Sequence, residues 1–394
     1  MNPDLERLHP YPFEKLGALF AGLPASDKSP VALSIGEPQH PSPDIVQQAI
    51  RDNTALLSRY PGTAGLAELR QAIAGWLERR FKLQRINAED QILPVNGTRE
   101  ALFSFTQALL DRQAAPLVLM PNPFYQIYEG ATLLAGGEPV YLPCTEASGL
   151  QPDFDAVDEH TWQRTQLLFI CTPGNPTGAT LSKAQLKALI QLADKYDFVI
   201  ASDECYSEIY RDTAPAGLLQ ACAELDRHDY RRCVVFHSLS KRSNLPGLRS
   251  GFVAGDSALL KPFLRYRTYH GCAMPVHHQI ASIAAWNDET HVHENRQRYA
   301  EKFDAVLDIL GGPLKVSAPD AGFYLWPKTP IDDEAFARRL KAEENVTVLP
   351  GRYLSRTVNG HNPGENRVRM ALVAELDQCL EGARRIRALI ERIG

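Results

Sequence analysis

The chain has 394 residues, 44% hydrophobic and 23% charged, which is the composition of an ordinary globular protein with room for a large domain and a smaller one. Its 42 Lys and Arg and 47 Asp and Glu give a formal net charge of -5, so no electrostatic feature favours nucleic acid or an anionic membrane surface. Small-molecule chemistry is the default expectation.

The N-terminus, MNPDLERLHPYPFEKL, is charged and interrupted by proline, so it lacks the apolar stretch of a signal peptide. No apolar run reaches the roughly 18 residues that a membrane-spanning helix needs. The seven cysteines are scattered, odd in number and without a C-x-x-C pair, which indicates reduced thiols. We therefore expect a cytoplasmic protein.

Three regions are predicted along the chain. Residues 1–40 are rich in proline and form an N-terminal arm, 41–285 form a large domain, and the helix-rich remainder, 286–394, forms a small C-terminal domain. From about Gln91, strand-like apolar runs alternate with helical ones, which predicts an α/β fold with a mostly parallel sheet. The clearest predicted strands are 117–120, 167–170, 198–201, 233–236 and 251–254.

One β-α-β unit is especially clear, because the strand 167–170 is followed by a helix over 182–196 and then by the strand 198–201. Ser182 and Gln185 match a capping box at the start of that helix. Polar motifs follow the strands at 171–178 (CTPGNPTG), 202–206 (SDECY) and 238–241 (SLSK). Loops at the carboxyl ends of parallel strands build the ligand site, so these three predict a cofactor pocket.

Lys241 is the candidate covalent residue of this pocket. It follows an apolar strand, has hydroxyl groups at Ser238 and Ser240, and precedes Arg249 by eight residues. A desolvated lysine near other cations offers a neutral amine that can carry a carbonyl compound. An isolated lysine is more often solvated, but the neighbouring motifs favour the covalent function here.

Asp203 follows the apolar strand 198–201, where a lone carboxylate is costly unless it meets a cation or a donor. A protonated pyridine nitrogen is one such cation, and a helix cap or an exposed strand end is the alternative interpretation. The turn 96–99 (NGTR) leads into an apolar helix over 101–110, whose N-terminus is a plausible anion site. Arg369, in the strand-like run 368–372, suits an α-carboxylate but could equally be an arginine at a strand edge.

Two histidine pairs, His277 with His278 and His291 with His293, lack carboxylate or cysteine partners at metal-ligand spacing. We therefore expect no metal site.

Five separated motifs occur in a fixed order: 34–38 (SIGEP), Tyr60 followed by Gly65 and Leu66, 175–178 (NPTG), Asp203 with Tyr206, and 238–241 (SLSK) with Arg249. Over essentially its whole length the chain thereby resembles the class I/II aminotransferases among the fold type I enzymes that use pyridoxal 5′-phosphate (PLP). The resemblance implies an α/β fold with a mostly parallel mixed sheet in a large PLP-binding domain, a smaller α+β domain, and a homodimer with shared active sites.

The resemblance also implies a role for each matching residue. Lys241 would carry PLP as a Schiff base and transfer the substrate's α-proton, and Asp203 would pair with the pyridine nitrogen. Asn175 and Tyr206 would bind the phenolic oxygen, and Tyr125 would stack on the ring. The phosphate would be surrounded by Gly97, Thr98, Arg99, Ser238, Ser240, Arg249 and, from a second subunit, Tyr60. The residues implied in binding the amino acid substrate are Gly36, Asn175 and Arg369.

Within the family, the chain is most similar to the succinyldiaminopimelate transaminases of lysine biosynthesis, through the stretches 11–15, 94–100, 238–244 and 266–274. Such enzymes exchange an amino group between N-succinyl-LL-2,6-diaminopimelate and 2-oxoglutarate. The remote carboxylate of this substrate needs a partner, for which Arg242, Arg267 and His270 are candidates.

Three other functions are considered. An aminotransferase of another amino acid, or a PLP-dependent C–S β-lyase, would use the same cofactor residues. A transcription regulator would need an added basic DNA-binding module, and the aminotransferase pattern already begins by residue 34. The regulator is therefore disfavoured, whereas the two enzyme alternatives stay open.

Overall fold

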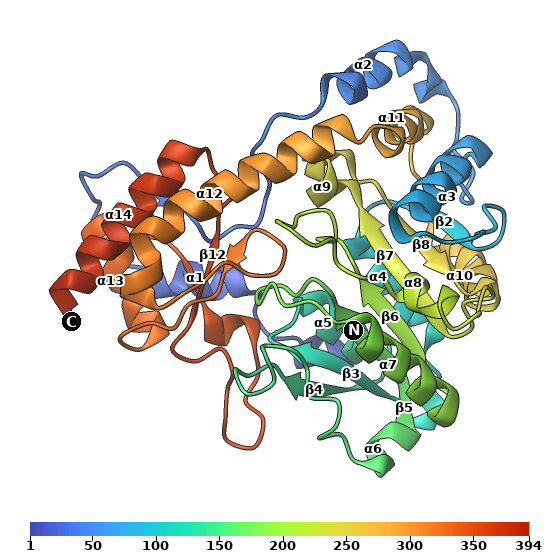
Figure 1. Cartoon of the computed structure of the whole chain (residues 1–394). Coiled ribbons are helices and arrows are strands. Elements are labelled where there is room, and N and C mark those ends of the chain that lie inside the picture. The colour runs from blue at the N-terminus through green and yellow to red at the C-terminus, as the bar shows by residue number, and fades with distance from the viewer. Residues whose placement is uncertain (394) are drawn as a thin grey trace.

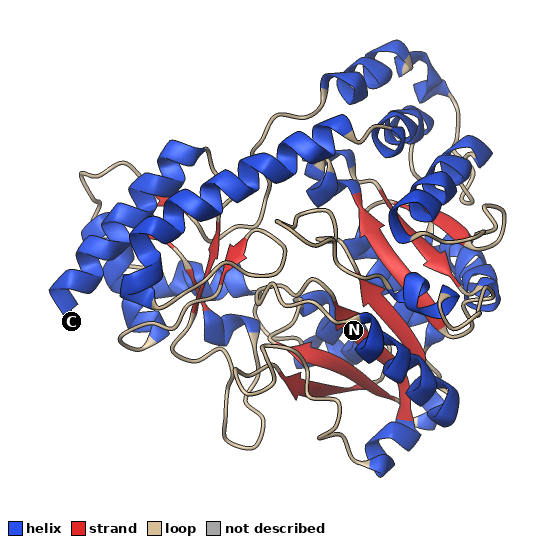
Figure 2. Ribbon diagram, viewed as in Figure 1, coloured by secondary structure: helices blue, strands red, loops and turns tan. Residues whose placement is uncertain are grey.

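A seven-stranded sheet is the central feature of the computed structural model, which describes residues 1–393 (Figures 1 and 2). Its strand order is β2-β8-β7-β6-β5-β3-β4, and β8 alone runs antiparallel to its neighbours. The prediction of a mostly parallel mixed sheet is confirmed. The strands are β2 (Ile92–Val95), β3 (Leu117–Asn122), β4 (Glu138–Pro143), β5 (Thr165–Cys171), β6 (Val199–Asp203), β7 (Cys233–Ser238) and β8 (Gly251–Gly255).

Helices cover both faces of this sheet, which is why its strands are apolar throughout rather than alternating. Successive residues of a strand point to opposite faces, so Leu168 and Ile200 pack in one core while Phe169 and Ala201 pack in another. Helices α3, α7, α8 and α11 contribute to the first core, and α4, α5 and α10 to the second. Their bounds are α3 (Ala67–Phe81), α4 (Thr98–Leu109), α5 (Gln126–Leu134), α7 (Lys183–Tyr196), α8 (Leu218–Ala223), α10 (Ser257–His270) and α11 (Val276–Asn287).

The predicted β-α-β unit is present as β5, α7 and β6. The capping box forms as expected, since Ser182 Oγ accepts from the Gln185 amide at 3.2 Å and Gln185 Oε1 accepts from the Ser182 amide at 2.9 Å. Helix α4 begins at Thr98 rather than at the predicted residue 101. The left-handed backbone of Gly97, with φ of 81°, turns the chain there and brings Thr98 and Arg99 into the first helical turn.

A third core lies in the C-terminal part of the chain and includes Val31 and Leu33 from the N-terminal segment. Strand β1 (Val31–Ala32) pairs in parallel with β10 (Val346–Thr347), which ties that segment to the C-terminal part. The predicted domain boundaries after residues 40 and 285 stay predictions. The other elements of this core are α12 (Thr290–Leu314), α13 (Asp333–Glu344), α14 (Leu376–Ile393), β9 (Tyr324–Leu325) and β12 (Val368–Ala371). Strand β11 (Leu349–Pro350) pairs with β12 and packs in a separate cluster.

The long helix α12 runs between the two parts of the molecule in Figure 1. None of the helices in residues 1–393 is long and apolar enough to cross a membrane. All seven cysteines are free thiols in this structure. The remaining helices are α1 (Pro12–Phe20), α2 (Asp44–Asp52), α6 (Glu159–Arg164) and α9 (Leu239–Arg242).

Candidate active site

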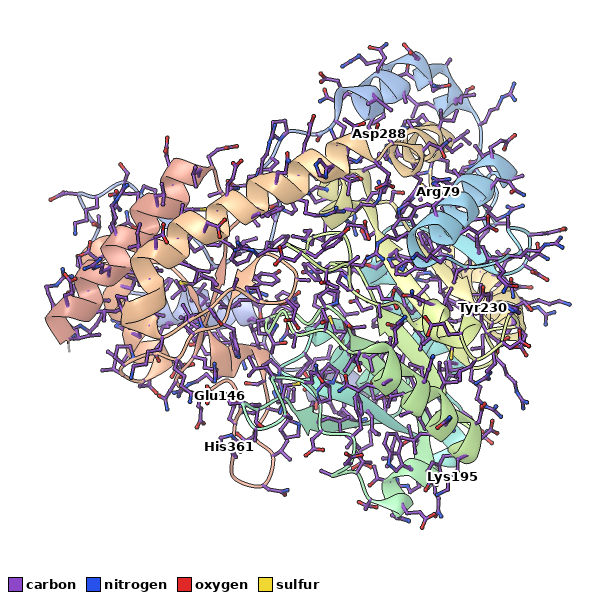
Figure 3. All side chains as sticks on the ribbon, in the orientation of Figure 1. Arg79, Glu146, Lys195, Tyr230, Asp288 and His361 are labelled. Atoms are coloured by element: carbon purple, nitrogen blue, oxygen red, sulfur yellow. The ribbon has the colours of Figure 1, made fainter. Side chains whose placement is uncertain are left out.

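A cleft of about 400 Å³ lies beyond the carboxyl ends of β5, β6 and β7, and residues of the C-terminal part form its other wall. Figure 3 shows side chains from both parts of the chain in the region between the sheet and the C-terminal helices. The three polar loops meet at this edge, as the sequence predicted. The predicted site residues that line the cleft are Gly36, Thr98, Arg99, Tyr125, Asn175, Asp203, Tyr206, Ser238, Ser240, Lys241, Arg249 and Arg369.

Lys241 lies in the short helix α9, directly after β7. The hydroxyl of Ser238 caps this helix by accepting from the Ser240 amide at 3.0 Å, which fixes the turn that carries the lysine. Lys241 Nζ donates to the carbonyl oxygen of Gly36. Burial lowers the pKa of Lys241 to about 8, because desolvation disfavours the charged amine. A substantial neutral fraction near pH 8 is what a nucleophilic lysine requires.

Asp203 is the last residue of β6 and only 5% exposed. Its Oδ2 accepts from the hydroxyl of Tyr128 at 2.7 Å, and its Oδ1 accepts from the backbone amide of Cys205 at 3.2 Å. Burial raises the pKa of Asp203, and the two hydrogen bonds oppose that shift. Within residues 1–393 the carboxylate has donors but no ion pair. A buried carboxylate that faces a cleft without a cationic partner suits a cationic ring nitrogen.

An anion-binding cradle forms at the start of α4. A methyl group at Gly97 would collide with the guanidinium of Arg249, so the glycine allows the arginine to approach this turn. The hydroxyl groups of Ser238 and Ser240 lie 2.9 Å apart on the wall of the same cleft. This site suits a phosphate, which needs hydrogen-bond donors and positive charge. It offers the free amide groups of the first helical turn from Thr98, two hydroxyl groups and one guanidinium.

Arg369 lies on β12 and is 6% exposed. Its Nη2 donates to the carbonyl oxygen of Ser34 at 2.7 Å and its Nη1 donates to Asn175 Oδ1 at 3.1 Å. The guanidinium also lies 4.6 Å from the ring centroid of Tyr324. Its buried Nε has no hydrogen-bond partner among residues 1–393. An arginine held so firmly at a cleft, with a donor left over, suits a carboxylate ligand.

Tyr206 places its hydroxyl 3.0 Å from that of Tyr324, beside the same wall. Burial raises the pKa of Tyr206 well above its ordinary value, so the phenol stays protonated and can donate.

The side chain of Arg99, which the resemblance places at the phosphate, contacts two phenol groups in this structure, and its phosphate contact stays a prediction. Its Nε donates to the hydroxyl of Tyr125 at 2.8 Å and its Nη2 donates to the hydroxyl of Tyr11 at 2.9 Å. The reason is that a guanidinium at the mouth of the cleft finds two phenol oxygens within reach. Tyr11 and Tyr125 thus join Arg99 in a cationic group, which we call the mouth cluster.

Two of the predicted residues lie outside the cleft wall. Gly97 contacts it through Arg249, as described, whereas Tyr60 is fully exposed. The implied contact of Tyr60 with a second subunit's phosphate stays a prediction.

Three residues were predicted as candidates to bind the substrate's remote carboxylate, and the structure contradicts two of them. Arg242 is buried, lies 4.9 Å from the ring centroid of Trp286, and donates to Glu289 at 2.6 Å. Arg267 is also buried and pairs with Glu100. A buried guanidinium requires an anion, and each has one in its own chain, so the prediction for these two arginines is wrong. His270 lies exposed at the end of α10, and its role stays a prediction.

Sequence reasoning missed Tyr128, Tyr324 and Tyr11 as members of the site. Tyr128 follows Tyr125 by three residues, a spacing that places both on the same side of a helical turn, and this signal could have pointed to it. Tyr324 is brought in from the C-terminal part only by the fold, and no local pattern marks it.

Known proteins with similar sequences and structures show the family of this chain. The family model "Aminotransferase class I and II" matches residues 28–386. A solved aminotransferase from Neisseria meningitidis is 51% identical, with a TM-score of 0.95, over 99% of this chain and 100% of that chain. Aminotransferase AspB from Helicobacter pylori is 37% identical, with a TM-score of 0.91, over 98% and 99%. The LL-diaminopimelate aminotransferase of Maridesulfovibrio salexigens is 30% identical over 98% of each chain.

The family model and the solved relatives define the class of this enzyme: the chain belongs to the class I and II aminotransferases. It is a PLP-dependent aminotransferase. The residues present fit the cofactor, because an unpaired buried carboxylate, a lysine of lowered pKa and an anion cradle open to the same cleft. Bound PLP supplies an electron sink that stabilises negative charge at the substrate's Cα.

Proposed function

We propose that this aminotransferase exchanges an amino group between N-succinyl-LL-2,6-diaminopimelate and 2-oxoglutarate. The diaminopimelate class of substrate is supported by relatives such as the enzyme of Maridesulfovibrio salexigens, which is named as an LL-diaminopimelate aminotransferase. One observation carries the choice of a diacid with a blocked second amine. Among the described residues, the cleft is lined by three guanidinium groups, from Arg99, Arg249 and Arg369, and by one carboxylate, that of buried Asp203. With Arg249 assigned to the phosphate, Arg369 and Arg99 remain for the substrate.

In this proposal Lys241 holds the cofactor covalently, and its amine then takes and returns the proton at the substrate's Cα. Asp203 pairs with the pyridine nitrogen, and Asn175 and Tyr206 donate to the phenolic oxygen. Tyr125 covers the ring. The proposed phosphate ligands are Gly97, Thr98, Ser238, Ser240 and Arg249, with Tyr60 contributed by a second copy of the chain.

Arg369 binds the α-carboxylate of the amino acid in this proposal. It is held by Ser34 and Asn175 without an acidic partner among the described residues, so it retains its charge for an anionic ligand. The carbonyl oxygen of Gly36 accepts from Lys241 Nζ, which places the backbone of residue 36 beside the reacting amine.

The mouth cluster binds the remote carboxylate. Arg99 is an exposed cation whose two contacts are phenol oxygens rather than carboxylates, so no ion pair competes with an incoming acid. The two hydroxyl groups orient the guanidinium and add donors of their own.

The charge of the cleft favours an acylated second amine over a free one. Unsuccinylated LL-2,6-diaminopimelate carries a second ammonium group, which would call for an acidic side chain near the mouth. Of the described residues that line this chain's cleft, Asp203 is the acidic one, and its oxygens accept from Tyr128 and Cys205. Succinylation removes that ammonium and adds a carboxylate, which matches the surplus of cations.

The test compares kcat/KM for the succinylated substrate, free LL-2,6-diaminopimelate and alanine, each with 2-oxoglutarate, in the wild type and in Arg99→Gln. Loss of a hydrogen bond to a charged group costs about 1.5 to 3 kcal/mol, so we expect a drop of about 10- to 150-fold for the diacid and little change for alanine. Arg384→Gln, at an exposed arginine of α14, is the matched control. A higher kcat/KM for alanine than for the succinylated substrate in the wild type would reject the proposal. Weaker retention of PLP in Arg99→Gln would show that Arg99 binds the cofactor's phosphate instead.

A further inference from the structure

Tyr128 donates a buried hydrogen bond to Asp203, and the chemistry described so far gives it no role. The tyrosine is fully buried in α5, does not line the cleft, and reaches Asp203 Oδ2 at 2.7 Å. We propose that Tyr128 is a positioning residue that keeps the shared proton on the cofactor's pyridine nitrogen rather than on Asp203. This inference rests on the proposed pairing of Asp203 with that nitrogen.

The position of the phenol is fixed on two sides. Its ring stacks on Phe169 of β5 with centroids 4.6 Å apart and an interplanar angle of 14°. It meets the ring of Tyr125 edge-on, at 5.8 Å and 88°. Packing of this kind leaves a side chain one rotamer, so the hydroxyl stays aimed at the carboxylate.

The donor changes how Asp203 shares a proton. A hydrogen bond to a carboxylate stabilises its charged form and makes it a weaker base, whereas burial does the opposite. In a buried pair of carboxylate and pyridine, the proton resides on the nitrogen only if the carboxylate is weak enough as a base. Tyr128 and the Cys205 amide are the donors that offset the burial of Asp203.

Of the other titratable groups near Asp203, His237 also lowers the pKa of this carboxyl, but less than the hydrogen bond from Tyr128 does. His237 lies 3.2 Å from Glu204 in a buried pair. Burial raises the pKa of both Cys171 and Cys205, so these thiols stay uncharged at neutral pH. Among the described residues around this carboxylate, Tyr128 is therefore the side chain whose removal most directly changes the basicity of Asp203.

The test uses Tyr128→Phe, with Tyr141→Phe as the matched control. Tyr141 also donates to a carboxylate, that of Glu129 on α5, at 2.6 Å, so the control removes an equivalent bond to the same helix. The first readout is the ¹⁵N chemical shift of PLP labelled at the pyridine nitrogen in the holoprotein. We expect Tyr128→Phe to move it toward the unprotonated value, and kcat to fall about 10- to 150-fold with little change in KM.

A second variant keeps the shape of the side chain. Replacing Tyr128 by 3-fluorotyrosine makes the phenol a stronger donor, so the ¹⁵N shift should move away from that of Tyr128→Phe, toward full protonation. An unchanged ¹⁵N shift in both variants, or an equal change in Tyr141→Phe, would overturn the inference. Asp203→Asn distinguishes failure of this inference from failure of the proposed function. If Asp203→Asn also leaves the ¹⁵N shift unchanged, the proposed pairing of Asp203 with the pyridine nitrogen is wrong, and not only the role of Tyr128.

Discussion

The lowered pKa of Lys241 predicts how the protein reacts before it holds its cofactor. With a pKa of about 8, about one Lys241 amine in ten is neutral at pH 7, against about one in 2,500 for an ordinary lysine. The assay is reductive methylation of the cofactor-free protein across pH 6 to 10, read by peptide mass spectrometry. Lys195 on α7, labelled in Figure 3, is the internal control, since a hydrogen bond with Tyr196 raises its pKa.

The same shift has a consequence for stability. Because the folded pKa of Lys241 is lower than the unfolded one, the unfolded chain binds more protons between pH 8 and about 10.4, and stability rises with pH across that window. Lys241→Met should therefore stabilise the cofactor-free protein at pH 7 by up to roughly 3 kcal/mol in urea unfolding, with the gain vanishing above about pH 10.4. Two results would refute this reasoning. One is that Lys241 becomes half-methylated at the same pH as Lys195 or at a higher pH. The other is that Lys241→Met does not raise the free energy of unfolding at pH 7.

Two further predictions concern the shared chemistry. Asp203→Asn removes the charge that holds the pyridine nitrogen protonated. The rate at which the substrate's α-proton exchanges with solvent should therefore fall far more than PLP occupancy does. Exchange at the wild-type rate would exclude Asp203 from the mechanism. Mixing Tyr60→Phe and Lys241→Ala subunits, each first shown to be impaired, should restore part of the activity, because some hybrid dimers hold one unmutated site. No recovery in hybrids confirmed by native mass spectrometry would place Tyr60 outside the partner's site.

The sequence predicted the sheet edge well because its signals are local. The predicted strand cores at 117–120, 167–170, 233–236 and 251–254 lie within observed strands, and that at 198–201 overlaps β6, which begins one residue later. Each predicted strand is a short apolar run, and polar loops follow three of them at its carboxyl end. Asp203 and Lys241 were predicted this way, since a charged residue in a polar loop that follows a buried strand is conspicuous in the sequence alone.

Side-chain partners were harder to predict because they depend on residues distant in the chain. Arg242 pairs with Glu289, 47 residues away, and the hydroxyl of Tyr128 reaches Asp203 across 75 residues. Whether a guanidinium faces a ligand or a carboxylate of its own chain is decided by tertiary packing, which no local pattern encodes. Arg99 illustrates this, because its backbone lies where the motif indicated while its side chain joins Tyr11.

The most direct test of the central claim is to find where the cofactor is attached. Borohydride reduction of the purified, PLP-loaded protein, followed by peptide mass spectrometry, should place the pyridoxyl label on Lys241, and Lys241→Ala should retain PLP without covalent label while losing turnover by several orders of magnitude. A label on another lysine in the wild type, or near-normal turnover in Lys241→Ala, would contradict the account.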